Sequence, residues 1–285
     1  MQYVSTRDAG SAYSAPETIV KGIADDGGLF VPSSFPTIDK EFLASLSEMT
    51  YPKRVAKVLH LSMDEFAEKE LLSFAEKAYS RFDGDPCPVV KIEDGLYVLE
   101  LWHGPTFAFK DMALTLLPYL MVESKKKLGV DETTLVLVAT SGDTGKAALE
   151  GFKNVKGSEI LVFYPEKGVS TMQKLQMVTQ EGENVAVVGV KGNFDDAQTA
   201  VKEIFTDEAV KAKLKEKGKA FSSANSINWG RLAPQIAYYV SSYVDLVDCG
   251  EIDLGDKVNF VVPTGNFGNI LAGYFAKKMG LPVKT

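Results

Sequence analysis

From about residue 96, short apolar runs rich in β-branched residues alternate with longer segments of helical periodicity. The apolar runs, which we interpret as strands, lie at residues 135–139, 160–164, 185–190 and 258–262. The helical patterns lie at 110–128, 144–153, 168–180, 194–217, 229–247 and 269–279. Strands that are apolar throughout are buried on both faces, and their alternation with helices is typical of parallel α/β sheets. Such sheets bind ligands at the carboxyl ends of their strands, in the loops that lead into helices.

The first ninety residues carry a mixed pattern without obvious chemistry. Gly27 and Gly28 predict a tight turn in which both glycines supply a positive φ. Two helical patterns follow near residues 39–47 and 64–81, and Asp64 is the predicted N-cap of the second. We expect this segment to pack against the rest of the chain. At the other end the alternation stops where another strand is due, which suggests a fragment, or a sheet whose remainder lies elsewhere.

The composition excludes several classes of function. A net charge of −7 over 285 residues leaves no basic face for general nucleic-acid binding. No apolar run approaches the roughly eighteen residues that a membrane span requires, and the first residues lack a signal-peptide core. Two cysteines (Cys87, Cys249) and two histidines (His60, His103) do not form a zinc site at any recognised spacing. We therefore expect a cytosolic protein with free thiols and no metal.

Lys110 is the most informative single residue. It follows three apolar residues, 107–109, at the point where a turn becomes a long apolar helix. An amine that is partly withdrawn from water loses some of its preference for the charged form, so its pKa falls. A neutral amine is what a Schiff base with an aldehyde cofactor requires. Most lysines are nevertheless solvated surface charges, so the interpretation depends on the loops that accompany Lys110.

The first such loop, residues 140–145, follows the strand at 135–139. Its small residues expose backbone N–H groups at the start of a helix, which is a favourable place for an anion. An ordinary turn capped by Ser or Thr has the same pattern. The loop is not a P-loop, because its glycines are too close together and Ala147 stands where magnesium coordination needs Ser or Thr.

The second loop, residues 263–269, joins the strand at 258–262 to a helix. Its two glycines allow the backbone to fold around a phosphate, although a plain turn is the alternative. The spacing does not match the dinucleotide fingerprint, so a compact monophosphate suits this loop better than a pyrophosphate.

The third loop, residues 225–231, places two amides, a hydroxyl and Arg231 at a helix start. The arginine can face a second anion with two parallel hydrogen bonds, or it can simply lie on the helix surface. An isolated lysine, a phosphate loop and a second anion site together indicate pyridoxal phosphate acting on an amino acid, with the cofactor as electron sink.

These residues resemble a known family. In their order along the chain they are similar to threonine synthases of the branch with a long N-terminal extension, and the resemblance covers essentially all 285 residues. The matching segments are 3–7, 26–32, 103–111, 139–145, 225–229 and 265–268.

The resemblance implies the fold-type-II architecture of pyridoxal enzymes, an α/β fold with two parallel-sheet domains and an N-terminal extension. The implied division is an extension at residues 1–90, a large cofactor-binding domain at 91–125 and 218–285, and a small domain at 126–217. The resemblance places the cofactor between the two α/β domains, and it implies a monomer or a homodimer.

By matching motif positions, Lys110 would hold pyridoxal 5'-phosphate and carry the proton transfers. The cradle for the cofactor phosphate would consist of Gly265, Asn266, Phe267, Gly268 and Asn269. The implied substrate-binding residues are Thr140, Ser141, Gly142 and Thr144 for the carboxylate, and Asn225, Ser226 and Arg231 for the phosphate. Asp143 would lie near the 3-hydroxyl of the cofactor; relatives with short N-termini carry Asn there, so its role stays open. The family group that contacts the pyridine nitrogen comes from a C-terminal segment absent from this sequence.

The implied reaction converts O-phospho-L-homoserine and water into L-threonine and phosphate. Three alternatives remain open from the sequence. A phospho-amino-acid lyase on the same fold would release a 2-keto acid, and a hydroxyamino-acid dehydratase would not need the anion site at Asn225 and Arg231. A non-catalytic binding protein would keep the fold without the chemistry.

Overall fold

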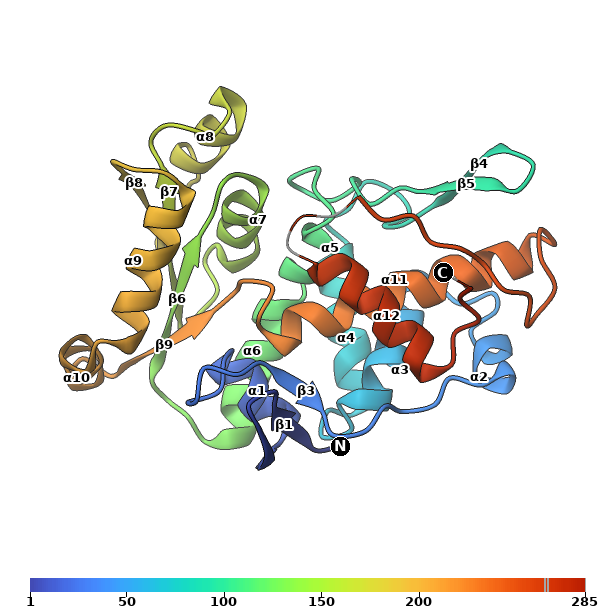
Figure 1. Ribbon diagram of the computed structural model, residues 1–285, viewed down its shortest axis with the longest axis horizontal. Helices are drawn as coiled ribbons and strands as arrows, with labels where there is room; N and C mark the ends of the chain where they lie inside the picture. The colour runs from blue at the N-terminus through green and yellow to red at the C-terminus, as the bar shows by residue number, and fades with distance from the viewer. Residues whose placement is uncertain (264, 266, 285) are drawn as a thin grey trace.

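The computed structural model describes residues 1–263, 265 and 267–284. A sheet with its covering helices lies on one side of Figure 1, and a larger helical part that contains both ends of the chain lies on the other. The strands are β1 Tyr3–Ser5, β2 Asp8–Tyr13, β3 Phe30–Pro32, β4 Val89–Glu93, β5 Leu96–Leu99, β6 Thr133–Ala139, β7 Ser158–Pro165, β8 Val185–Val190 and β9 Lys219–Ser223. The first helices are α1 Ala15–Lys21, α2 Lys40–Ser45, α3 Tyr51–Ser62, α4 Glu68–Tyr79, α5 Asp111–Leu114 and α6 Leu117–Leu128. The later ones are α7 Asp143–Phe152, α8 Thr171–Val178, α9 Phe194–Thr206, α10 Glu208–Glu216, α11 Trp229–Asp248 and α12 Gly268–Met279. Within the described residues, no helix is both long enough and apolar enough to cross a bilayer.

A parallel sheet confirms the predicted α/β class. In the part of the chain that the structure describes, its strand order is β8-β7-β6-β9, and all pairs are parallel. Helices α7 and α9 cover opposite faces of this sheet (Figure 1). On β6, Val136 and Val138 belong to the main core, whereas Leu137 and Ala139 pack with Val201 of α9. Both faces of β6 are therefore buried, which explains why its sequence is apolar throughout.

The carboxyl ends of the neighbouring strands β6 and β9 lie at the same edge of the sheet, because the two strands are parallel. The loop after β6 leads into α7, and the loop after β9 leads into α11. The sheet thus brings the predicted loops 140–145 and 225–231 to one edge. The domain boundary that we propose at residue 217 falls just before β9, although β9 itself is part of this sheet.

The strand predicted at residues 258–262 is wrong. Within the described residues this segment forms only an isolated parallel bridge between Val258 and Val283. Val261 is 95% exposed, so the segment is not buried on both faces. An apolar run becomes a strand only when a neighbouring strand forms hydrogen bonds with its backbone groups. The described chain supplies only the one bridged pair, Val258 and Val283.

The helix predicted at residues 110–128 is divided into α5 and α6. Pro118 lacks the N–H that would bond to the carbonyl of Leu114, and its ring excludes that carbonyl from the helix ladder. The freed carbonyl oxygen of Leu114 lies against Gly151 of α7, where an added Cβ would come within 2.2 Å of it. The glycine therefore allows the close approach of α7 to the helix that follows Lys110. The helix predicted at 194–217 is also divided in two, here at Asp207, whose carboxylate caps the N-terminus of α10.

Replacing Gly151 with Ala is expected to lower the free energy of unfolding by about 2 kcal/mol, because a backbone carbonyl cannot move away as a flexible side chain can. Urea denaturation measures this change. Gly10→Ala is the control, since its Cβ would meet only the end of the Asp8 side chain, at 3.3 Å; we expect a change within about 0.5 kcal/mol. Equal stability of the two variants would contradict the tight contact between α5 and α7.

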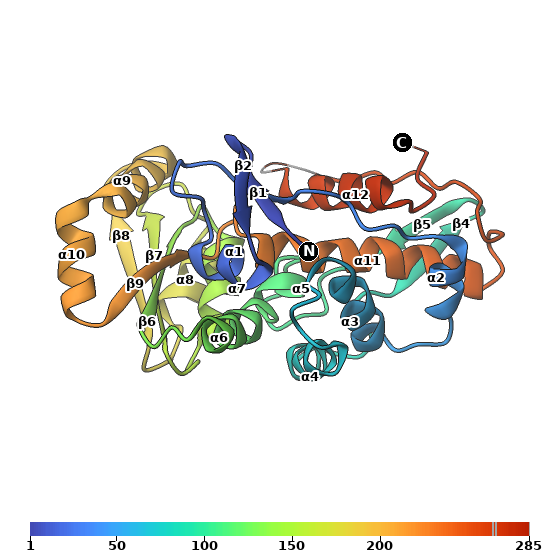
Figure 2. The ribbon, with the colours of Figure 1, turned by 90° about the horizontal axis from the view of Figure 1, so that it is seen from below.

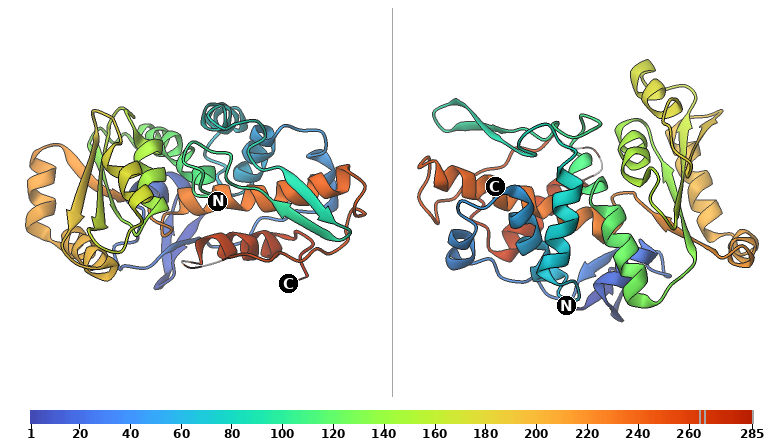
Figure 3. Two further views of the ribbon diagram at one scale, coloured as in Figure 1. Left: turned by 90° about the horizontal axis from the view of Figure 1, so that it is seen from above. Right: turned by 180° about the vertical axis from the view of Figure 1, so that it is seen from behind.

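The N-terminal part is a small antiparallel sheet, order β2-β1-β3, that lies beside α1 (Figure 2). Helices α3 and α4 lie side by side below α11 in Figure 2, and the β4–β5 hairpin projects away from the parallel sheet (Figure 3). Two details of the sequence prediction are wrong here. Asp64 is not an N-cap; it binds the N-terminal ammonium group, and α4 begins at Glu68. Gly28 does not have a positive φ. A Cβ added to Gly28 would lie 2.0 Å from the Ser5 hydroxyl, so the close approach of Ser5 to this turn requires glycine.

Candidate active site

The position of Lys110 is fixed by its neighbour Asp111. The Asp111 carboxylate is fully buried and accepts hydrogen bonds from the backbone N–H of Thr106, at 2.7 Å, and from the Thr106 hydroxyl, at 2.6 Å. Gly104 lies so close that an added Cβ would meet the Asp111 side chain at 2.5 Å. The turn that precedes Lys110 is therefore closed around this carboxylate. Lys110 itself directly precedes α5.

The Lys110 amine is the predicted catalytic group, and it lies in a partly desolvated place. Its side chain is 16% exposed, and Nζ lies 4.5 Å from the centre of the Phe109 ring. Nζ also lies 3.4 Å from Oδ2 of Asp143, which is the first residue of α7. Burial lowers the pKa of Lys110, and the nearby Arg231 lowers it further, whereas Asp143 opposes both effects. The fraction of neutral amine is thus higher than at a solvated lysine.

The loop after β6 is organised by Thr140. The buried Thr140 hydroxyl accepts hydrogen bonds from the backbone N–H groups of Gly142 and Gly145, each at 3.0 Å. This oxygen therefore closes the turn, and its predicted part in carboxylate binding is limited to holding the loop. Ser141 is exposed and Thr144 is half-buried, so both side chains remain available to a ligand.

The glycine-rich loop before α12 lies against the loop after β9. A Cβ on Gly268 would come within 3.2 Å of the Ser226 Cβ, so the two loops touch. Gly265 is exposed, and nothing lies within 4 Å of the position of its Cβ. Phe267 adopts a left-handed backbone conformation and is 65% exposed. Asn266 lies outside the described residues.

The side chain of Asn269 does not face the loop. Its Oδ1 accepts hydrogen bonds from the hydroxyl groups of Tyr238 and Tyr239 in α11. These bonds occupy the acceptor oxygen of the side chain, and the backbone N–H at the start of α12 is a donor that suits a phosphate.

Arg231 is a buried cation without a carboxylate partner in the described part of the chain. Its side chain is 5% exposed, and one guanidinium nitrogen donates to the carbonyl of Ala224 at 2.8 Å. Burial lowers the pKa of Arg231 to about 10. A buried guanidinium is normally paired, so this one is suited to an anionic ligand. Arg231 also acts on the charge of Lys110, which links the loop after β9 to the predicted catalytic amine.

Asn228 has a structural part that the sequence did not reveal. Its buried amide donates to the carbonyls of Ile19 and Ser223, and its Oδ1 accepts from the N–H of Gly230. The N-terminal helix α1 is thereby tied to the loop that carries Asn225 and Ser226. Asn225 itself is partly exposed, and it lines a cleft of about 1180 Å³ with Ile23, Ala24 and Leu29.

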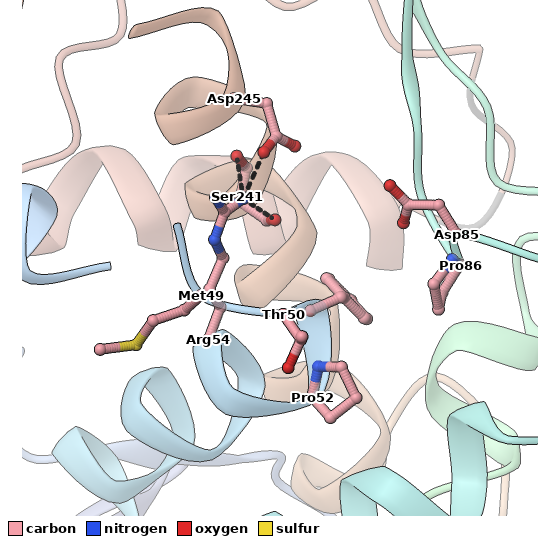
Figure 4. A pocket seen from close by; sticks show the side chains of 9 residues that line it. Met49, Thr50, Pro52, Arg54, Asp85, Pro86, Ser241 and Asp245 are labelled. Atoms are coloured by element: carbon pink, nitrogen blue, oxygen red, sulfur yellow. Dashed lines mark hydrogen bonds and ion pairs between the residues drawn. The ribbon is translucent and has the colours of Figure 1, made fainter. Parts of the chain in front are cut away.

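A second pocket lies away from these residues. It has a volume of about 310 Å³, and Figure 4 shows the side chains around it. Its lining residues are Met49, Thr50, Tyr51, Pro52, Arg54, Asp85, Pro86, Ser241 and Asp245. None of the predicted site residues lines it, and the Arg54 guanidinium is already bonded to Ser241 and Asp245.

Comparison with known proteins shows the family to which the chain belongs. Residues 2–79 match the family model described as threonine synthase N terminus, and residues 86–284 match that of the pyridoxal-phosphate dependent enzymes. The chain is 40% identical to the threonine synthase of Schizosaccharomyces pombe over all of its own length and 55% of that protein. It is 41% identical to the human threonine synthase-like 1 over 96% of the chain and 38% of that protein. The crystal structure of the threonine synthase from Brucella melitensis with bound pyridoxal phosphate superposes on it with a TM-score of 0.88, at 37% identity, over the whole chain and 59% of that structure.

The residues present fit pyridoxal phosphate. An amine with a lowered pKa can form a Schiff base with the aldehyde. The exposed Gly265 and the N-terminus of the twelve-residue helix α12 suit the phosphate. The fold, the fit of the residues to pyridoxal phosphate and the two family models agree. The chain belongs to the pyridoxal-phosphate-dependent enzymes and is of the threonine synthase type.

Proposed function

We propose that the chain carries the catalytic lysine and the substrate sites for conversion of O-phospho-L-homoserine and water into L-threonine and phosphate. The observation that carries the proposal is the partly desolvated Lys110 amine, with the unpaired cation Arg231 acting on its charge. The names of the relatives support it. The chain spans 55% of the first of these proteins, so the activity of the whole enzyme is part of the proposal.

Each predicted residue has a part in this proposal. Bound pyridoxal phosphate supplies the electron sink that stabilises negative charge on the substrate carbons. Lys110 holds the cofactor aldehyde, and its amine then takes and returns protons. The phosphate cradle consists of Gly265, Asn266, Phe267, Gly268 and the backbone of Asn269. The substrate carboxylate binds at Ser141, Gly142 and Thr144, whose loop Thr140 holds in place. The leaving phosphate binds at Asn225, Ser226 and Arg231.

The buried Arg231 supports a phosphate ester as the proposed substrate. Within the described residues the Arg231 guanidinium makes one hydrogen bond, and a guanidinium of this kind gains most from a dianion that accepts two further bonds from it. A substrate with a free hydroxyl group leaves this cation unpaired in its buried place. We therefore expect O-phospho-L-homoserine to be turned over at least about 100-fold more efficiently than L-homoserine or L-serine.

The experiment measures phosphate release, threonine and 2-keto acid in the same reaction, with pyridoxal phosphate and O-phospho-L-homoserine added to the protein. Equal amounts of threonine and phosphate support the proposal. Formation of a 2-keto acid with the phosphate indicates a lyase, and equal turnover of unphosphorylated serine indicates a dehydratase. Absence of any product from a protein that binds the cofactor indicates a binding protein.

A further inference from the structure

The side chain of Gln173, in the first turn of α8, is held at both ends. Its Nε2 donates a hydrogen bond to Oδ1 of Asp143 at 2.5 Å. Its Oε1 accepts a hydrogen bond from the hydroxyl of Ser170 at 3.0 Å, and Ser170 is also the N-cap of α8. An amide that is fixed in this way cannot rotate freely, so it holds the carboxylate of Asp143 in one orientation.

The glycine next to Asp143 provides the space for this amide. A Cβ on Gly142 would lie 2.6 Å from Nε2 of Gln173 and 2.8 Å from its Oε1. The Gln173 side chain therefore lies flat against the backbone of Gly142. A residue with a side chain at position 142 would collide with the Gln173 amide, so this position requires glycine.

Asp143 is half-exposed, with 44% of its side chain accessible, and within the described residues its carboxylate is bonded only to Gln173 and Lys110. The charged groups that face the Lys110 amine are Asp143 of α7, Arg231 of α11 and Asp111 of α5. Among them Asp111 is bonded to Thr106, and Arg231 is bonded to the Ala224 carbonyl. The orientation of Asp143 depends on Gln173, which binds Oδ1 of the carboxylate. The other carboxylate oxygen, Oδ2, lies 3.4 Å from Nζ of Lys110.

We propose that Gln173 is a positioning residue that fixes the Asp143 carboxylate against the Lys110 amine and so sets the proportion of neutral amine. The inference rests on the proposed part of Lys110 as the amine that holds the cofactor. Gln173 does not touch the reacting atoms; it acts through Asp143. Without Gln173, the carboxylate turns toward water and the ammonium form of Lys110 loses its nearest opposite charge.

The test measures the pKa of Lys110 in the protein without cofactor. Trace acetylation with acetic anhydride at a series of pH values, followed by mass spectrometry of the Lys110 peptide, gives that pKa. We expect Gln173→Ala to lower it by about 0.5, in the same direction as Asp143→Asn, since the half-exposed carboxylate is partly screened by water. In the double variant the two effects are not expected to add, because both changes remove the same interaction.

Two further variants distinguish positioning from a loss of packing. Gln173→Met keeps the length of the side chain but removes its N–H donor, and we expect it to lower the pKa of Lys110 as Gln173→Ala does. Gln176→Ala, on the same helix and without a hydrogen bond to Asp143, is the matched control, and we expect no shift. Far-UV circular dichroism during heating verifies that all variants are folded.

An unchanged Lys110 pKa in Gln173→Ala would overturn the inference, and so would a shift that adds fully to that of Asp143→Asn. An unchanged Lys110 pKa in Gln173→Met would show that the side chain acts by packing alone. These readings need neither cofactor nor substrate. A failure of the positioning hypothesis is therefore distinguishable from a failure of the proposed reaction, which only product formation tests.

Discussion

Lys110→Ala is expected to abolish formation of the Schiff base with pyridoxal phosphate and to lower turnover of O-phospho-L-homoserine by at least about 10³-fold. The variant removes the amine that binds the aldehyde, and with it the group that we expect to move protons during the reaction. The visible absorption spectrum with added cofactor measures the first effect. Phosphate release measures the second.

The control for this variant is Lys146→Ala. Lys146 lies in α7, and its side chain is 17% exposed, almost the same as the 16% of Lys110. Within the described residues it is bonded to Glu150 and Gln180, neither of which is a predicted site residue. We expect this variant to keep the cofactor absorbance. A Lys110→Ala protein that still shows the Schiff-base band would transfer the catalytic role to another lysine.

The central strands β6 and β7 could be predicted from the sequence because they are buried in the sheet. Their side chains are therefore apolar in continuous runs, as in Val136, Leu137 and Val138 of β6. The same kind of run predicted the edge strand β8, although Val188 there is 40% exposed. The same signal failed at 258–262, where Val261 is almost fully exposed. An apolar run does not reveal whether a partner strand exists, because pairing is a property of the tertiary structure.

Other elements were missed for different reasons. Strand β9 contains Lys219, Ser222 and Ser223, and its extended form depends on pairing with β6 and not on its own composition. Helix α3 begins with Pro52 in its first turn, where the missing N–H is tolerated, and this proline conceals a helical pattern. The short strands β1 and β3 have no periodicity to detect.

The candidate site was predicted as separate loops, and the structure supplies their contacts. Local sequence indicated Lys110 and the small residues after β6, since a lysine behind apolar residues and glycines at a helix start are local features. The approach of Asp143 to Lys110 joins residues 33 positions apart, and its hydrogen bond to Gln173 joins residues 30 apart. No local pattern predicts such contacts, because only the packing of α5 against α7 and of α7 against α8 creates them. Gln173 had the appearance of an ordinary helical surface residue.

One buried cation joins several segments in the part of the fold away from the site. Arg54 of α3 is 5% exposed, and its guanidinium donates to the carbonyl of Leu46, the hydroxyl of Ser241 and the carboxylates of Asp245 and Asp248. Figure 4 shows Arg54 directed at Ser241 and Asp245. One side chain therefore joins the segment after α2 to the long helix α11, which carries Arg231 at its other end.

Arg54→Met is expected to lower the free energy of unfolding by about 3 kcal/mol, measured by urea denaturation with tryptophan fluorescence. Methionine fills much of the space, but two partly buried carboxylates on α11 lose their counter-charge. Lys57→Met on the same helix is the control, because its ion pair with Glu68 is long, at 3.8 Å, and exposed. We expect the control to change stability by less than about 0.5 kcal/mol.

The pH dependence of the loss identifies its cause. Burial raises the pKa of Asp245 even with Arg54 present, and loss of the cation raises it further. A carboxylate with a raised pKa in the folded state binds a proton more tightly there than in the unfolded chain. The deficit of Arg54→Met is therefore complete above the pKa of Asp245 in the folded variant, and it shrinks as the pH falls from there to the lower pKa of Asp245 in the folded wild-type protein. A deficit that stays constant over this range would mean that lost packing, and not an unpaired charge, destabilises the variant.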